Sequence, residues 1–146
     1  MTVRVQAGAF APGAELDAFM EGRRSDGAVV SFTGVVRDTD GTLEAMEIEH
    51  YPGMTERAIG EMVETARLRW SLGAALVIHR HGRLTPGTPI MMVATAARHR
   101  VAAFEAAEFL MDYLKSRAPF WKKEVTADGA AWVDATPTDE AALDRW

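Results

Sequence analysis

The chain has 146 residues, of which 48% are apolar and 25% charged, a balance typical of one globular domain over residues 1–146. Its net charge of −5 argues against non-specific nucleic-acid binding, and no apolar run reaches the roughly 20 residues that a membrane helix needs. Cysteine is absent, which excludes disulfides, thiolate metal ligands and a cysteine nucleophile. No signal peptide is visible, so a cytoplasmic location is expected.

Periodicity and turn signals predict eleven elements. They are a strand over 3–8, a helix over 11–24, strands over 27–38 and 43–51, a helix over 54–70, strands over 74–82 and 89–97, a helix over 98–118, a hairpin of two strands over 121–135 and a helix over 136–146. Pro12 suits the first turn of the first helix, and Pro119 ends the third. Thr138 is the expected N-cap of the last helix.

The turns predict how the strands pair. Strands 27–38 and 43–51 flank an Asp-Thr-Asp-Gly turn and are expected to form a hairpin, as are 74–82 and 89–97. Asp128-Gly129 is typical of a type I′ turn between the last two strands. Hairpins with two main helices predict an α+β fold: a mostly antiparallel sheet with helices on one face, plus a small β-hairpin subdomain near the C-terminus.

Lys115 is the first candidate for chemistry. It follows Met111 by four residues and Phe104 by eleven, so it is expected to share a side with an apolar stripe of the helix. Val101, Leu114 and Ala118 complete this stripe. Desolvation or nearby cations lower the pKa of a lysine and favour a neutral nucleophile or general base. The alternative is an ordinary lysine at a helix C-terminus, with its head group in water.

The basic residues are concentrated. Residues 98–123 hold six Lys/Arg against three Asp/Glu, a net +3 that leaves −8 for the rest of the chain. This distribution favours a small anionic ligand over a long polyanion. His99 and Arg100 begin the helix 98–118 and could bind phosphate there, although a solvated pair is the alternative. Residues 99 and 115 lie about 24 Å apart along a straight helix, so they can serve one site only if the ligand is long, the helix is broken or a neighbouring subunit contributes.

Two further motifs have open interpretations. Arg37 follows an apolar strand and either enters a pocket or stays at the surface. His79 and His81 share a strand face, but two histidines without a third ligand are weak evidence, so no metal site is expected.

Four segments together, "FTGVVRD", "EHYPGMTE", "HRHGRL" and "MDYLKSRAPFWKKE", resemble the catalytic subunits of molybdopterin synthase, the MoaE family, over nearly the whole chain. The resemblance implies an α/β-hammerhead-like fold and a sulfurtransferase. Its substrate would be cyclic pyranopterin monophosphate, a phosphorylated pterin, which receives two sulfurs as a dithiolene in molybdenum cofactor biosynthesis. No cofactor is implied.

The resemblance also implies partners. A small ubiquitin-like sulfur-carrier subunit would supply sulfur from a Gly-Gly thiocarboxylate tail, and the catalytic subunits would form a homodimer within a heterotetramer. The absence of cysteine agrees with sulfur arriving on another chain, and the tail "ALDRW" is not a Gly-Gly carrier tail.

By resemblance, Lys115 is the central catalytic lysine, an acid/base or transient nucleophile near the thiocarboxylate, and Lys122 is the second essential lysine. Pro119, Phe120 and Trp121 would turn the chain so that both lysines face one pocket. The other implied substrate-binding residues are Val35, Val36, Arg37, His99, Arg100, Lys123 and Glu124. His99 and Arg100 would act near the dimer interface, which would remove the distance problem. The family often has a basic residue shortly after the last hairpin, for a phosphate contact across the subunits, whereas this chain has Thr136 and no arginine in that region.

Two other functions fit the same residues. A non-enzymatic module could bind an anionic metabolite through these cations without a protein partner. A purely structural subunit would tolerate Lys115→Ala but not changes at its aromatic contacts.

Overall fold

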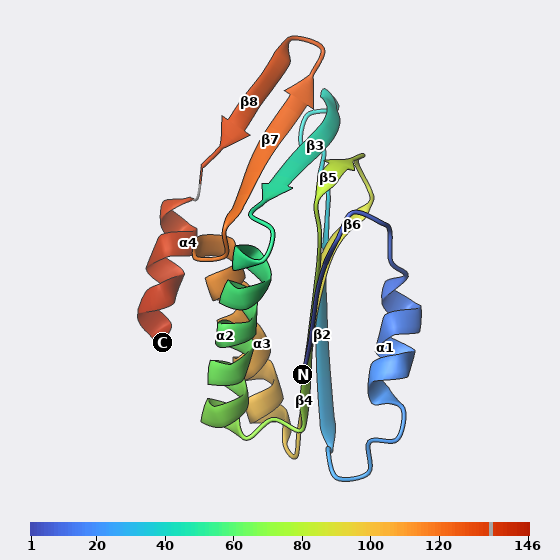
Figure 1. Ribbon diagram of the computed structural model, residues 1–146, viewed down its shortest axis with the longest axis vertical. Helices are drawn as coiled ribbons and strands as arrows, with labels where there is room; N and C mark the ends of the chain where they lie inside the picture. The colour runs from blue at the N-terminus through green and yellow to red at the C-terminus, as the bar shows by residue number, and fades with distance from the viewer. Residues whose placement is uncertain (135) are drawn as a thin grey trace.

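The structure is a computed structural model that describes residues 1–134 and 136–146 (Figure 1). The expected end of the last hairpin, Ala135, lies outside the described residues. The strands are β1 (Thr2–Gln6), β2 (Ala28–Val35), β3 (Leu43–His50), β4 (Ala74–Arg80), β5 (Gly82–Leu84), β6 (Pro89–Ala97), β7 (Phe120–Thr126) and β8 (Gly129–Val133). The helices are α1 (Pro12–Met20), α2 (Met54–Trp70), α3 (Arg100–Ser116), α4 (Pro137–Ala142) and the 3₁₀ helix η1 (Leu143–Arg145). Within the described residues, no helix is long and apolar enough to cross a membrane.

Four strands form the first sheet, in the order β1-β4-β6-β2. β1 is parallel to β4, whereas the β4–β6 and β6–β2 pairs are antiparallel. The mostly antiparallel sheet and the pairing of β4 with β6 therefore confirm the sequence prediction. β4 and β6 are central strands, and nearly all of their residues are buried because helices cover both faces of the sheet.

The helices occupy both faces of this sheet (Figure 1). α2 and α3 pack together on one face, where Ile59 and Leu110 are completely buried. α1 lies on the other face, and its Leu16 and Phe19 pack against the cluster around Ile78 of β4. The prediction that the helices lie on one face of the sheet is therefore right for the two long helices, α2 and α3. It is wrong for α1, whose apolar residues cover the second face.

α3 buries a different side from the expected stripe. Val101 and Phe104 are 63% and 60% exposed, so this part of the prediction is wrong. The fully buried positions include Ala103, Ala106 and Leu110. Alanines lack a long side chain and let the helix backbone approach the sheet closely, which sets the helix phase more strongly than the larger apolar residues do.

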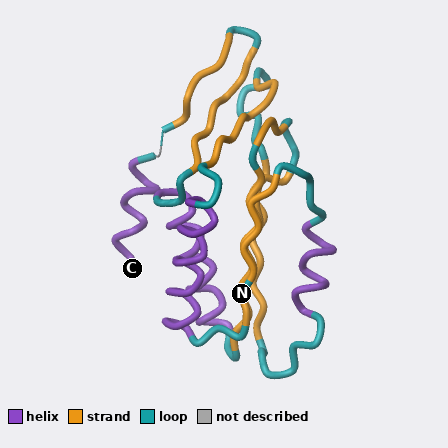
Figure 2. The backbone as a smooth tube through the Cα atoms, in the orientation of Figure 1, coloured by secondary structure: helices purple, strands orange, loops and turns teal. Residues whose placement is uncertain are grey.

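The second sheet has the order β5-β3-β7-β8. Figure 2 shows it beyond the N-terminal end of α2 and the C-terminal end of α3. The predicted hairpin of β7 and β8 is confirmed, but the type I′ turn is not, because among the described non-glycine residues only Ser71 has a positive φ. Gly129 takes the positive φ of 124° instead.

The predicted hairpin between β2 and β3 is wrong. β2 pairs with β6, while β3 pairs with β5 and β7 in the other sheet. The reason lies just after β2, where the Val36 N–H donates to the Thr88 carbonyl at 3.0 Å and the Val36 carbonyl accepts from the Gly87 N–H at 2.8 Å. These bonds carry the chain past the end of the first sheet before it can turn back. The structure also differs from the sequence prediction at the short strand β5, whose residues were expected to belong mostly to a turn.

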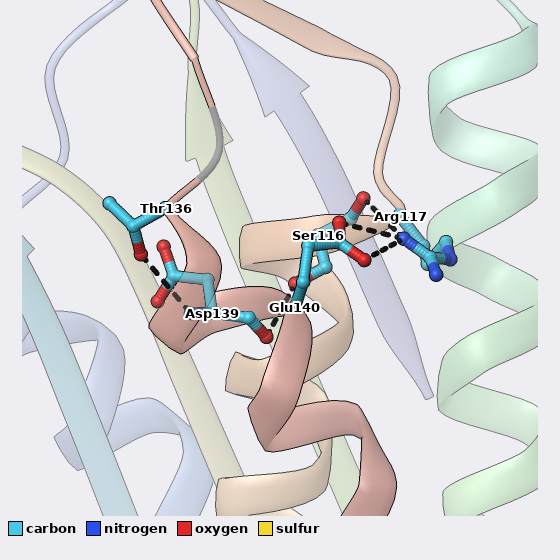
Figure 3. A network of polar contacts seen from close by, with 5 residues as sticks. All are labelled: Ser116, Arg117, Thr136, Asp139 and Glu140. Carbon is cyan, nitrogen blue, oxygen red and sulfur yellow. Dashed lines mark hydrogen bonds and ion pairs between the residues drawn. The ribbon is translucent and has the colours of Figure 1, made fainter.

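The C-terminal helix α4 is attached to the end of α3 (Figure 3). Ser116 Oγ donates to the Asp139 carbonyl at 3.0 Å, and Arg117 forms an ion pair with Glu140 at 2.9 Å. Thr136 is the N-cap, because its Oγ1 accepts the Asp139 N–H at 3.1 Å, so the prediction of Thr138 is wrong. Pro137 then takes the first helical position, where a missing N–H costs nothing.

Candidate functional site

An open pocket of about 420 Å³ lies where the two sheets meet the end of α3. Its wall combines the end of β2, the strands β3, β6 and β7, and the last turns of α3. The predicted site residues that line it are Val35, Arg37, Lys115, Lys122 and Glu124. Apolar side chains, including Met46 and Met111, form much of the remaining wall. One pocket therefore gathers cations on an apolar background.

Lys122 is the most perturbed lysine of the pocket. It lies in β7 and is half-buried. Burial first, and then the positive charge of Lys115, lower the pKa of Lys122 to about 8, while Asp139 acts in the opposite direction. A lysine with a pKa near 8 is neutral in about a tenth of the molecules at pH 7, far more than an ordinary lysine, so Lys122 can act as a base or nucleophile.

Lys115 approaches the same pocket from α3, beside Met111 and Leu114. The residue is exposed overall, so the expected burial alongside Phe104 is wrong. Its contribution is a positive charge close to Lys122. The sequence argument expected burial at Lys115, whereas Lys122 is the more buried lysine of the pair.

The corner between α3 and β7 holds the two lysines in place, as expected. Thr55 Oγ1 donates to the Pro119 carbonyl at 3.0 Å and accepts the Tyr51 N–H at 2.9 Å, which ties the corner to the start of α2. Phe120 stacks on His79 with ring centroids 3.8 Å apart. Lys122 then follows two residues later, pointing into the pocket.

His79 is a pocket residue that sequence reasoning considered only as a metal ligand. It is 3% exposed, and burial lowers its pKa to about 3, with help from the charges of Lys122 and Lys115. Its Nδ1 lies 2.8 Å from the Arg80 carbonyl, an acceptor, so the proton is on Nδ1 and Nε2 is free to accept. His81 instead stacks on His50, with ring centroids 4.0 Å apart. No cluster of metal-binding side chains occurs among the residues that the structure describes.

The remaining predicted residues divide into three groups. Val36 is buried at the pocket's edge, with its backbone used in bonds to residues 87 and 88. Lys123 points to the opposite face of β7, where its Nζ lies 4.4 Å from the ring centre of Trp132. His99 and Arg100 are exposed at the far end of α3, about 24 Å from Lys115 by helix length, and do not line this pocket.

This arrangement can bind a small anion and move a proton. Arg37 and Lys115 supply positive charge, Lys122 supplies a group that loses its proton readily, and neutral His79 supplies an acceptor. Apolar walls strengthen these electrostatic interactions because they exclude water from part of the site.

The chain is also similar to known proteins of one family. The family model described as "MoaE protein" matches residues 5–117. The curated "Molybdopterin synthase catalytic subunit" of Cereibacter sphaeroides is 70% identical over 146 residues, covering 100% of both chains. The solved "Molybdopterin biosynthesis MoaE protein" from Burkholderia ambifaria has a TM-score of 0.85 at 50% identity, over 99% of this chain and 97% of that one. "Molybdopterin Synthase from Staphylococcus aureus" has a TM-score of 0.81 at 28% identity, over 90% and 96% of the two chains.

Proposed function

The chain belongs to the MoaE protein family, and from this premise we propose that it is the catalytic subunit of a molybdopterin synthase. It converts cyclic pyranopterin monophosphate into molybdopterin, taking two sulfurs from the C-terminal thiocarboxylate of a small sulfur-carrier subunit. The reaction needs sulfur from another chain, which agrees with a sequence that has no cysteine.

The observation that carries this proposal is the pair of lysines in one pocket. Lys115 and Lys122 come from different elements, and the pKa of Lys122 is lowered to about 8. A pocket that only held an anion would gain from fully charged lysines, whereas a pocket that transfers protons or acyl groups needs one near neutrality. The lowered pKa therefore favours the enzyme over a simple anion-binding module.

We assign roles from the geometry. Lys122 acts as the base or transient nucleophile toward the thiocarboxylate carbonyl, and Lys115 lowers its pKa and attracts the anionic tail. Arg37 and the backbone around Val35 bind the pterin or its phosphate at the end of β2. Glu124, two residues after Lys122 on the same side of β7, accepts hydrogen bonds from the substrate's nitrogen donors.

The far-end pair, His99 and Arg100, belongs in this scheme to the site of a second copy. Their position at the start of α3 suits binding of a phosphate, because free helix N–H groups point outward there. In a homodimer within the heterotetramer, each copy would supply this pair to its partner's pocket. Lys123 is left out of the pocket by its direction, and a cytoplasmic location stays a prediction.

Reconstitution tests the proposal. The chain is mixed with a thiocarboxylated carrier and cyclic pyranopterin monophosphate, and the dithiolene product is assayed. Product from the native chain, with at least a roughly hundredfold loss in Lys122→Ala and in Lys115→Ala (about 2.7 kcal/mol of barrier), supports the proposal. Lys123→Ala is the control variant. The Lys123 side chain lies on the opposite face of β7 from the pocket, so this change should reduce product formation much less.

Other results have distinct meanings. Product from both lysine variants would keep the enzyme but remove these lysines from the chemistry. No product from a folded native chain with an active carrier would favour the anion-binding module.

A further inference from the structure

His79 presents one ring nitrogen to the main pocket. It lies on the same face of β4 as Ala75 and Val77, which belong to the main core, and follows them to the end where the pocket opens. Within residues 1–134 and 136–146, its Nε2 has no hydrogen-bond partner, and no fully enclosed side-chain nitrogen or oxygen lacks one. Nε2 therefore borders the open space of the pocket, although the residue as a whole is only 3% exposed.

The surroundings of the ring fix both its orientation and its proton. Phe120 stacks on it with ring centroids 3.8 Å apart and ring planes at 18°. Nδ1 donates to the Arg80 carbonyl at 2.8 Å, and moving this proton to Nε2 would break that bond. Burial, together with the charges of Lys122 and Lys115, lowers the pKa of His79 to about 3, which opposes a second proton. Near neutral pH, Nε2 therefore accepts a hydrogen bond and does not donate one.

No charged group could replace this acceptor without changing the lysines. Arg37 and Lys115 are donors, Glu124 is an acceptor with a negative charge, and the threonine hydroxyls of the pocket can donate or accept. A carboxylate at the position of His79 would pair with Lys122 and raise its pKa. A neutral imidazole accepts a hydrogen bond beside Lys122 without that effect. His79 thus combines a fixed acceptor with a lysine that stays easy to deprotonate.

The redox state of a pterin determines whether its ring can use such an acceptor. In a tetrahydropterin, the nitrogens of the reduced ring carry N–H groups, which donate hydrogen bonds. In the fully oxidised, aromatic ring, the same nitrogens carry lone pairs and can only accept. A lone pair placed opposite Nε2 is repelled and leaves two polar groups without partners in a site that partly excludes water. A fixed acceptor therefore distinguishes two forms that have nearly the same size.

We propose that His79 Nε2 accepts a hydrogen bond from a ring N–H of the substrate and thereby selects the reduced form of the phosphorylated pterin over its oxidised form. This inference rests on the proposed function, which supplies the pterin. The cations of the pocket bind the phosphate, which both redox forms carry, so they do not make this distinction. With a pKa of about 3, His79 is not the base of the reaction, and its role is specificity.

Calorimetric titration without oxygen tests the selection. The probes are cyclic pyranopterin monophosphate in its tetrahydro form, the same compound after oxidation of its ring to the aromatic pterin, and inorganic phosphate. The native chain should bind the reduced probe about tenfold or more tightly than the oxidised one. His79→Phe keeps the stacking on Phe120 and removes the acceptor, so it should bind the reduced probe about tenfold more weakly. Its affinity for the oxidised probe and for phosphate should change little.

Two further variants separate specificity from structure. His81→Phe is the matched control, because His81 is a neighbouring histidine that stacks on His50 and does not line the pocket. It should leave the affinities for all three probes unchanged. His79→Gln places an amide in the pocket that can present either its oxygen or its NH₂ group. This variant should bind the two redox forms about equally, with a gain for the oxidised form that a merely structural role of His79 does not produce.

Each outcome decides something. Loss of the preference in His79→Phe, with phosphate binding kept, supports the selection. An unchanged preference in this variant would overturn it, as would an equal loss for all three probes, which would make His79 structural. NMR titration of Lys122 in His79→Phe excludes an indirect effect, since a large change in its pKa would assign the loss to the lysine and overturn the selection.

The same titrations distinguish this inference from the proposed function. A native chain that makes the dithiolene product in the reconstitution, but binds both redox forms equally, would overturn only the role of His79. A native chain that binds neither pterin and makes no product with an active carrier would remove the proposed function, and this inference with it.

Discussion

The positive charge of Lys115, at the end of α3, lowers the pKa of Lys122, which enters the same pocket from β7. The two residues are seven positions apart, and the chain turns between them at Pro119. The charge state of Lys115 therefore affects the pKa of Lys122, and titration of Lys122 can measure this effect directly.

Replacing Lys115 by methionine should raise the pKa of Lys122 above about 8, toward the ordinary lysine value of 10.5. The methionine keeps the apolar stem and removes the charge, so the acidic limb of the pH–rate profile should move to higher pH together with the titration of Lys122. NMR of the lysine side chains can follow this, because the chain contains only three lysines. Lys123→Met, on the opposite face of β7, is the control and should shift Lys122 much less. An unchanged Lys122 titration in Lys115→Met would contradict the coupling.

His79 should make the fold sensitive to acid. The pKa of His79 is about 3 in the folded chain and 6.5 ordinarily. Between pH 3 and pH 6.5 the unfolded chain is therefore protonated at this histidine while the folded chain is not. Stability therefore falls as pH drops from 6.5 toward 3, by up to about 1.4 kcal/mol per pH unit. His79→Phe keeps the stacking on Phe120 and should flatten this slope in urea unfolding measured at several pH values. His99→Gln, at an exposed position, should leave the slope as it is. An equally steep slope in His79→Phe would exclude the buried histidine as its source.

Two threonines near the C-terminus provide a matched pair. Thr136 caps α4 through the Asp139 N–H, whereas Thr138 makes no such bond. Thr136→Ala should destabilise α4 by about 1 kcal/mol, and Thr138→Ala should have little effect. The hydrogen-exchange rate of the Asp139 amide, measured in each of the two variants, reports the stability of α4. Equal rates in the two variants would mean that the cap contributes nothing to the helix.

Mixed dimers test whether His99 and Arg100 act on a partner's pocket. Lys115→Ala and Arg100→Ala should each be nearly inactive alone. If each site combines residues from two copies, an equal mixture forms hybrid dimers with one intact site, and about a quarter of the native activity should return. Mass spectrometry confirms subunit exchange before the assay. Exchanged dimers that stay inactive would place both groups in the same copy's site.

Much of the fold could be predicted from the sequence because local signals agree with it. The helix 54–70 is confirmed to the residue, and Pro119 ends α3 near the predicted place. The pairing of β2 could not be predicted in this way. Its apparent hairpin turn and its real continuation through Val36 are compatible with the same residues, and only the bonds to residues 87 and 88 decide between them.

The sequence indicated several of the residues that line the pocket, including Lys115 and Lys122, but not which of these side chains are buried. The cluster of lysines is visible as local charge, and the motifs around it are specific to one family. Burial is not a local property, however. Phe104 is exposed because alanines determine which side of α3 faces the sheet, so only the C-terminal part of the expected stripe, around Leu114, is buried beside Lys115. His79 shows the same limit, because its low pKa comes first from burial and then from the charges of Lys122 and Lys115, which lie far along the chain.

The composition of the pocket also has a consequence for synthesis in the cell. One wall comes from the end of β2, while Lys115, Lys122 and Glu124 belong to the final quarter of the chain. A chain still on the ribosome can form the pairs of β1, β4, β6 and β2 well before β7 emerges. A chain that ends before β7 holds every strand of the first sheet but neither Lys122 nor Glu124, so the pocket gains these groups only with the last part of the chain to be synthesised.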